Sequence, residues 1–408
     1  MTDTTARRRL PAWCAVLLVA CCLLPRASAQ TRPGEGFEEF EEVDPYTKGE
    51  REALDRLGYV SLGVFRWQGA QFTKDVQEAL GGTDMLWVET EHFKIGSSLT
   101  TYAFAPDADE KKLLAAELER LEKKTGRWRG KKKELDPWLR LHLYAQRAEE
   151  LYASFCADFG LAPSDFEPKK RILGQEHKIK LLVCERESEL SRYIALNYPG
   201  YEQYEFLGRV TPEAGLFFGT SVEALRANWT KPEEQPIDTM LHCQVVAGLA
   251  AVFLEGFRNT YYVAPTWLPF AAGHVYVRRI DPRWVSSCGH SPDAFRREDD
   301  WKWERDVYSL VSNEFFASTE TMFGWTGYDD MKMRDHMVAW AKLEYLLTVA
   351  EGDRKSFLMT LVTRGPEKDE KEERLARQRR ALSTAFRLTP EQFDEQWAAW
   401  VSKNWRRK

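Results

Sequence analysis

The sequence predicts an α+β protein that is predominantly helical and two-lobed, with the strands in a small N-terminal lobe. Short runs of aromatic and β-branched residues bounded by turn residues lie within 84–218, as expected of strands. Apolar residues recur at intervals of three and four through much of the rest, as expected of helices that bury one face. The composition, 43% hydrophobic and 13% aromatic over 408 residues, is sufficient for a packed core.

The first half of the chain is predicted to mix strands and helices. The pattern predicts strands near 86–96, at 178–184 and at 215–218, and helices at 108–124, 137–160 and 187–196. The helix at 137–160 is expected to end before Gly160, because glycine readily adopts the left-handed conformation that closes a helix.

The second half is predicted to be helical. Apolar residues lie on several sides of the segment 237–257, which indicates a central, buried helix. Further helices are predicted at 267–277, 331–350, 353–363, 367–386 and 390–401, with a loop at 281–300.

The first 29 residues have the pattern of a cleavable secretory signal peptide. Arginines at 7–9 precede an uncharged, mostly apolar run at 10–24, and Ala27-Ser28-Ala29 supplies the small residues of a cleavage site. The apolar run is short for a bilayer-spanning helix, although an N-terminal membrane anchor is an alternative. The protein is therefore expected to be exported to the periplasm or the extracellular space.

A second processing site overlaps the first. Leu18-Val19-Ala20-Cys21 resembles a bacterial lipobox, which would make Cys21 a lipidated residue. The Ala-Ser-Ala site lies at a better distance from the apolar run, so simple cleavage is preferred. No later segment reaches about 18 uninterrupted apolar residues, so no transmembrane segment is expected in the mature chain.

The mature chain is mildly acidic. The whole chain carries a net charge of −5 and the signal segment +3, which leaves −8 after cleavage. This balance argues against a nucleic-acid partner. The predicted organisation is a signal peptide (1–29), a flexible acidic leader (30–50), an N-terminal α+β lobe (51–230) and a helical lobe (231–408).

Four cysteines remain after the signal is removed. An even number in an oxidising compartment permits two disulfides, and buried free thiols are the equally weighted alternative. The cysteines are Cys156, Cys184, Cys243 and Cys288.

Two consecutive helices carry a family resemblance. His242-Cys243-Gln244-Val245-Val246 lies on the apolar helix, and Trp267-Leu268-Pro269-Phe270-Ala271 begins the next one. This arrangement resembles the secreted peptidase-MA-like gluzincins, a family of zinc metallopeptidases and uncharacterised bacterial relatives with a thermolysin-like, two-lobed fold. In that family an H-E-x-x-H helix supplies two zinc ligands and the general base, and a W-L-x-E-G helix supplies a third ligand.

The motif positions are degenerate in this chain. The resemblance places His242 at the first ligand, Cys243 at the general base, Val246 at the second ligand and Phe270 at the third. Valine and phenylalanine cannot bind a metal, and one histidine is insufficient. The resemblance nevertheless implies that His242, Val246 and Phe270 face a common pocket.

Two replacement sites are alternatives to this interpretation. His242, His274, Cys288 and His290 are weak candidates for a rebuilt metal site, if the loop at 281–300 folds over the helices. A cysteine nucleophile, Cys243 or Cys288, could pair with a histidine base, which would be His242, His274 or His336. Adjacent residues such as His242 and Cys243 cannot readily form the required hydrogen bond, so a disulfide is preferred.

The resemblance therefore implies an exported, non-catalytic pseudo-peptidase with no catalytic residues and no cofactor, whose former substrate cleft binds a peptide or protein. One alternative is an active secreted zinc metallohydrolase with non-standard ligands. Another is a carbohydrate-binding or structural module of the envelope, for which Trp301 and Trp303 are the candidate sugar-stacking residues.

Overall fold

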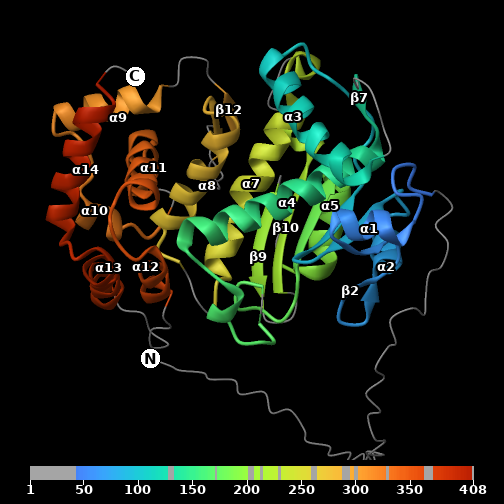
Figure 1. The fold of residues 1–408 in the computed structure, drawn as a ribbon, viewed down its shortest axis with the longest axis horizontal. Helices are drawn as coiled ribbons and strands as arrows, with labels where there is room; N and C mark the ends of the chain where they lie inside the picture. The colour runs from blue at the N-terminus through green and yellow to red at the C-terminus, as the bar shows by residue number, and fades with distance from the viewer. Residues whose placement is uncertain are drawn as a thin grey trace, which may run out of the picture. The chain divides into compact units, whose positions relative to one another are not determined.

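The computed structural model describes residues 43–126, 133–170, 172–200, 206–211, 215–227, 231–258, 264–286, 295–297, 302–327, 330–362 and 371–406. These ranges all belong to one unit of the chain, Phe40–Lys408. The predicted signal peptide and Cys21 lie outside the described residues. The structure is α+β and predominantly helical, as predicted (Figure 1).

A six-stranded mixed sheet lies in the N-terminal part of this unit. Its order is β1 (Tyr59–Leu62), β4 (Leu86–Thr90), β5 (Phe93–Ser97), β8 (Ile179–Cys184), β10 (Gly215–Ser221) and β9 (Phe206–Thr211). β5, β8 and β10 are parallel, whereas β1, β4 and β9 pair antiparallel with their neighbours. All of β8 is buried, as expected of a central strand covered on both faces.

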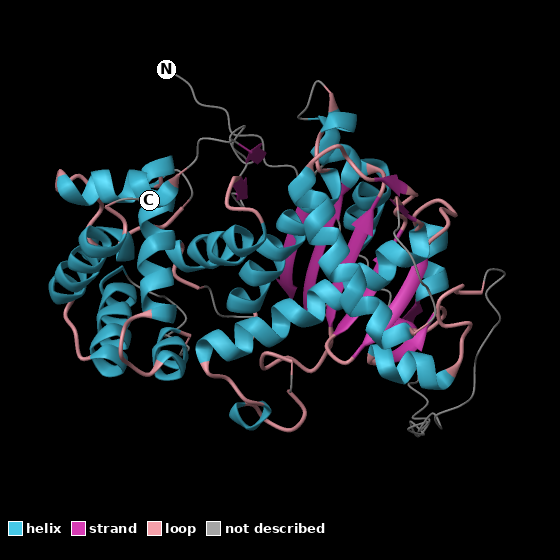
Figure 2. Ribbon diagram, turned by 45° about the horizontal axis from the view of Figure 1, so that its top comes forward, coloured by secondary structure: helices cyan, strands magenta, loops and turns pink. Residues whose placement is uncertain are grey.

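Helices cover both faces of the sheet (Figure 2). One face carries α4 (Pro137–Phe159) and α7 (Ile237–Glu255), with α3 (Ala108–Thr125) beside α4, and the other carries α2 (Thr73–Ala79) and α5 (Glu187–Asn197). A separate hydrophobic core lies on each face of the sheet, and alternate residues of β8 contribute to one or the other. Leu181 and Val183 join the first, and Leu182 and Cys184 join the second.

The single strand predicted near 86–96 is a hairpin of two strands, β4 and β5. The backbone N–H of Phe93 donates to the Thr90 hydroxyl at 3.1 Å, and that of His92 donates to Glu149 of α4 at 3.0 Å. The turn contains no glycine or asparagine and is held by a partner distant in sequence, so local turn residues gave no signal for it.

Local capping residues fix the bounds of α4. Asp136 accepts a hydrogen bond from the Leu139 N–H at 2.9 Å, Pro137 occupies the first turn, and Gly160 ends the helix at φ 64°. The predicted end before Gly160 is confirmed.

The predicted flexible leader is fixed in place at its end, which corrects the prediction for residues 44–47. Asp44 is buried and accepts hydrogen bonds from the Tyr46 N–H and from the side chain of Thr47. His142 of α4 lies 3.1 Å from the same carboxylate, and its other ring nitrogen lies 2.7 Å from the hydroxyl of Tyr59. A buried carboxylate with this many partners holds the segment against α4.

The predicted central helix is α7, and nearly all of its residues are buried. Among the described residues it is the one helix long and apolar enough to cross a bilayer, but 94% of that window is buried inside the protein. α7 packs on β9 and β10 and on α8 (Trp267–Ile280), so the two predicted lobes share one core.

The last third is helical, as predicted. It contains α9 (Trp303–Ser312), α10 (Thr319–Phe323), α11 (Met333–Thr348), α12 (Arg354–Leu361), α13 (Lys371–Phe386) and α14 (Pro390–Asn404). A partly buried ion pair of 2.7 Å between Lys342 of α11 and Asp394 of α14 helps to join these helices.

Shorter elements complete the unit. They are α1 (Arg51–Leu57), α6 (Val222–Ala227), β2 (Arg66–Gln68), β3 (Gln71–Phe72), β6 (Tyr102–Ala103), β7 (Glu134–Leu135), β11 (Trp284–Ser286), β12 (Phe295–Arg297) and two 3-10 turns (Pro163–Asp165 and Pro232–Glu234). β11 and β12 form an antiparallel pair within the segment predicted as a loop, which corrects that prediction for these two stretches.

Candidate functional site

α7 and α8 form an antiparallel pair. A Cβ atom on Gly273 would lie 3.6 Å from the Cβ of Ala247, and Thr239 near the start of α7 lines one cavity with Ile280 at the end of α8. With a helical rise of 1.5 Å per residue, this register places Phe270 about 12 Å along α7 from His242. Phe270 instead contacts the ring of His336 on α11.

The predicted motif positions therefore do not form one pocket. Cys243 and Val246 lie in the apolar core, where they are 0% and 3% exposed. Phe270 is half-buried and directed to α11. His242, by contrast, lies beside charged groups.

His242 faces α3 and α4 from the same side of α7 as Asp238, one helical turn before it. Its Nδ1 lies 3.5 Å from a carboxylate oxygen of Glu117 on α3. Burial, followed by the positive charges of Arg147 and Arg120, lowers the pKa of His242 well below its usual value. The imidazole is therefore neutral at physiological pH.

Arg147 of α4 forms a buried cluster with Glu117 of α3 and Asp238 of α7, called the Arg147 cluster below. Its guanidinium donates to both oxygens of Glu117 at 3.1 and 2.6 Å, and to Asp238 at 2.6 Å. The three side chains are at most 2% exposed. The sequence interpretation missed this arginine, because its two partners lie on different helices and become visible only once α3, α4 and α7 are packed together.

The residues around His242 do not suit a zinc ion. Zinc prefers three or four nitrogen, sulfur or carboxylate ligands. Here the carboxylates of Glu117 and Asp238 are paired with Arg147, and the two other ligand positions of the motif, Val246 and Phe270, are apolar. In the part of the chain that the structure describes, no three His, Cys, Asp or Glu side chains are placed to hold a metal ion.

The other predicted metal candidates do not join His242. His274 is fully buried, and its Nε2 lies 3.2 Å from Nδ1 of His336 on α11. Its ring also contacts that of Trp303, which is itself 0% exposed and unavailable for stacking on a sugar. Cys288, His290 and Trp301 lie outside the described residues.

The described cysteines lie on three different elements. Cys156 of α4 and Cys184 of β8 are free thiols, and burial raises the pKa of Cys156 to about 11. Cys243 is buried on α7. The pairing of cysteines after export stays a prediction.

The buried histidines predict a fall in stability at acidic pH. Burial lowers the pKa of His336 to about 4, and those of His242 and His274 also lie well below the unfolded value of about 6.5. Below pH 6.5 the unfolded chain therefore binds protons that the folded chain does not. As the pH falls from about 6.5 to about 4, each of these histidines should lower the free energy of unfolding by up to about 1.4 kcal/mol for every pH unit.

Urea denaturation at a series of pH values measures this slope. His336→Asn should reduce the slope of the unfolding free energy against pH by the amount that one bound proton contributes. His177→Ala, at an exposed histidine, should leave this slope unchanged. Equal slopes for wild type and His336→Asn would contradict the assignment.

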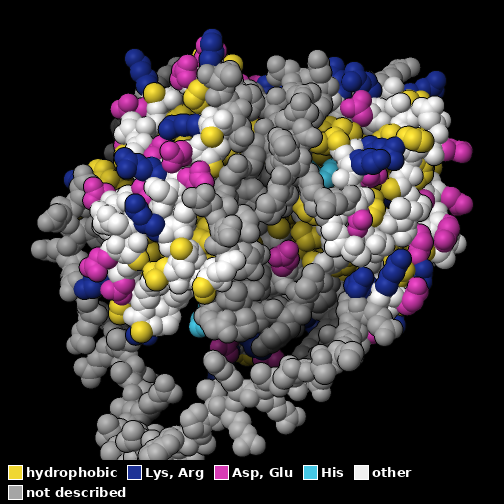
Figure 3. All heavy atoms as spheres, turned by 180° about the vertical axis from the view of Figure 1, so that it is seen from behind, with side chains coloured by type: hydrophobic (Ala, Val, Ile, Leu, Met, Phe, Trp, Pro, Cys, Tyr) yellow, Lys and Arg dark blue, Asp and Glu magenta, His cyan; other side chains and the backbone are white. Residues whose placement is uncertain are grey.

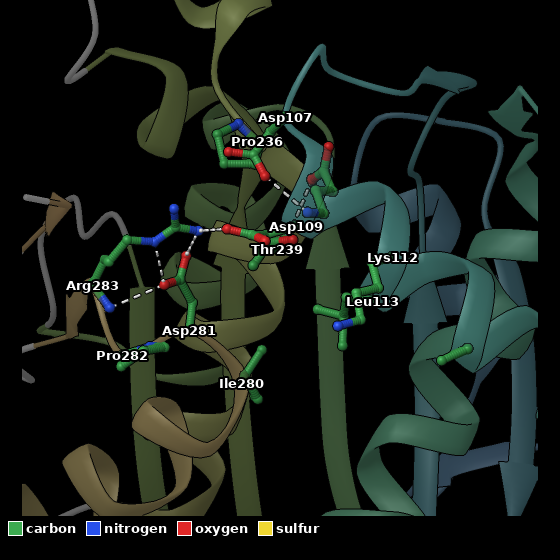
Figure 4. A pocket seen from close by; sticks show the side chains of 12 residues that line it. Asp107, Asp109, Lys112, Leu113, Pro236, Thr239, Ile280, Asp281, Pro282 and Arg283 are labelled. Carbon is green, nitrogen blue, oxygen red and sulfur yellow. Dashed lines mark hydrogen bonds and ion pairs between the residues drawn. The ribbon is translucent and has the colours of Figure 1, made fainter. Parts of the chain in front are cut away.

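A cavity of about 580 Å³ lies next to the Arg147 cluster (Figure 4). It is bounded by the first turns of α3, by Pro236 and Thr239 at the start of α7, and by residues 280–283 after α8. Figure 4 shows Arg283 reaching from this last segment to Asp281 and Asp109. The corresponding nitrogen–oxygen distances are both 3.0 Å.

The fold and this site define an α+β protein with a buried ion-pair centre and an acidic cavity beside it. Comparison of the chain with models of protein families, with curated proteins and with solved structures finds no match.

Proposed function

We propose that this protein is an exported, non-catalytic binding protein on a peptidase-like scaffold, and that it holds a peptide or a segment of another protein. The observation that carries the proposal is the bonding of Arg147 to Glu117 and Asp238, beside the one histidine that the motif retains. The cavity between α3, α7 and α8 is the proposed binding site.

The local chemistry supports binding rather than hydrolysis. A hydrolytic zinc site needs open coordination at the metal and a general base for the bound water. The cationic guanidinium of Arg147 opposes a second cation nearby, and Cys243 stands where the family has glutamate. A degenerate gluzincin architecture is part of the proposal. The order of elements, with an α7–α8 pair after a mixed sheet, supports it, whereas the contact of Phe270 with His336 departs from the common pocket that the resemblance implies.

The surface supports a peptide or protein partner over a nucleic acid. On the face seen in Figure 3, basic and acidic side chains of the described residues are interspersed rather than gathered into a basic stripe. Nucleic-acid binding depends on such a stripe to neutralise phosphates.

Metal analysis and hydrolysis assays on purified residues 30–408 test the proposal. We expect substoichiometric zinc and no cleavage of casein or peptides, with or without added zinc. His242→Ala should change neither result. His177→Ala, a control substitution at an exposed position, should also leave both unchanged. Stoichiometric zinc that is lost in His242→Ala but kept in His177→Ala would establish the alternative, an active zinc hydrolase.

A further inference from the structure

The cavity beside α7 has apolar walls and an acidic lining. Leu113 and Ala116 of α3 and Ile280 of α8 line its sides. Asp107, Asp109, Glu110 and Asp281 supply four carboxylates, whereas Lys112 and Arg283 supply two cations. The lining is therefore net negative, which favours a cationic guest.

Glu110 is a buried hydrogen-bond acceptor in the lining of this cavity. It is 1% exposed, and its carboxylate accepts hydrogen bonds from the Thr239 N–H at 3.1 Å and from the Tyr102 hydroxyl at 2.8 Å. Each carboxylate oxygen can accept a further hydrogen bond. Burial and the nearby Asp238 raise the pKa of Glu110, so a cation bound here would relieve an unfavourable charge.

Thr239 independently indicates a ligand. It is 5% exposed and lines the cavity, and its hydroxyl oxygen has no hydrogen-bond partner in the structure. Buried hydroxyls are usually paired, so an unpaired one at a cavity wall indicates a place for a hydrogen-bonding group of a ligand.

From these features we infer that the cavity binds the side chain of a lysine or arginine in the partner peptide, with its cationic end at Glu110 and Thr239. The aliphatic stem of such a side chain suits the apolar walls, and its N–H groups supply the missing donors. This inference rests on the proposed binding function and names the class of peptide.

Arg283 acts in this arrangement as an internal competitor. It pairs with Asp281 and Asp109 at the cavity, although its side chain remains 25% exposed. A bound cationic side chain would compete with Arg283 for these carboxylates. Removing Arg283 should therefore strengthen binding, an effect that general damage to the fold would not produce.

Fluorescence anisotropy with labelled peptides tests the inference on residues 30–408. The probes are alanine-based hexapeptides that carry one central lysine, arginine or norleucine. We expect the lysine or the arginine peptide to bind about tenfold more tightly than the norleucine peptide. The two cationic probes distinguish an ammonium from a guanidinium preference.

Variants then locate the site. Glu110→Gln and Thr239→Val should each abolish most of the preference for the cationic peptide, and Arg283→Ala should increase affinity for it. Glu119→Gln removes the same charge from an exposed position of α3 and should have no effect. If Glu110→Gln proves unfolded by circular dichroism, Asp109→Asn at the exposed rim should still weaken cationic binding.

Two results would overturn the inference. One is equal affinity for the lysine, arginine and norleucine peptides, and the other is no binding of any cationic probe at millimolar concentration. Both leave the non-catalytic assignment intact, since zinc content and peptide cleavage decide that separately.

Discussion

Replacing Arg147 by methionine is expected to lower the free energy of unfolding by about 3–5 kcal/mol. The substitution would leave the carboxylates of Glu117 and Asp238 buried without their common partner. The cost arises from the desolvated charges that remain rather than from the strength of the lost pair, because replacing a whole buried ion pair by apolar groups is often neutral. Urea denaturation, monitored by circular dichroism, measures the change in the free energy of unfolding.

Arg120→Ala is the matched control for this prediction. Arg120 pairs with Glu150 at 3.0 Å, but both side chains are nearly half exposed, so the loss should be below about 1 kcal/mol. Adding Glu117→Gln to Arg147→Met should restore part of the stability, because one of the two buried carboxylates is then uncharged, whereas Asp238 keeps Arg140 as a partner at 4.0 Å. A loss for Arg147→Met no larger than that for Arg120→Ala would contradict the assigned role.

Gly248→Ala should also destabilise the protein, even though alanine favours helices by about 1 kcal/mol over glycine. A Cβ atom on Gly248 would lie 1.9 Å from the buried ring of Phe218, so either that ring or α7 would have to shift. Overpacking of this kind costs about 1–3 kcal/mol, and more where backbone must shift. Thermal and urea denaturation should both show the net loss.

Gly273→Ala supplies the control with the opposite sign. Its Cβ would meet the nearest atoms at 3.6 Å, an ordinary contact, so the gain in helix propensity of up to about 1 kcal/mol should remain. Gly248→Ala/Phe218→Leu should recover part of the lost stability. A neutral effect of Gly248→Ala would indicate that α7 packs less closely on the sheet than the structure shows.

Sequence reasoning was most successful where local residues determine structure. The terminating Gly160 was predicted from the sequence, and the capping residue Asp136 directly precedes the predicted start of the helix at 137. The turn between β4 and β5 was missed because Glu149, 57 residues after His92, is the group that holds it. Local patterns carry no information about such a partner.

The candidate site shows the same limit. His242 was identified from its position on an apolar helix, but its surroundings depend on Glu117 and Arg147, which come from two other helices. Trp303 was a candidate for sugar binding beside acidic residues, yet α8 and α11 bury it against His274 and Trp340. Burial of this kind is decided by tertiary packing and not by neighbours in the sequence.

The fixed position of Asp44 sets a distance limit for a membrane-attached form of the protein. If a lipid were attached at Cys21, the chain between residues 21 and 44 could reach at most about 80 Å. The point where α4 holds Asp44, rather than the start of the predicted α+β lobe, would then be the far end of the tether. A lipidated form could present its acidic cavity only to partners within that reach of the membrane surface, whereas a cleaved form would have no such restriction.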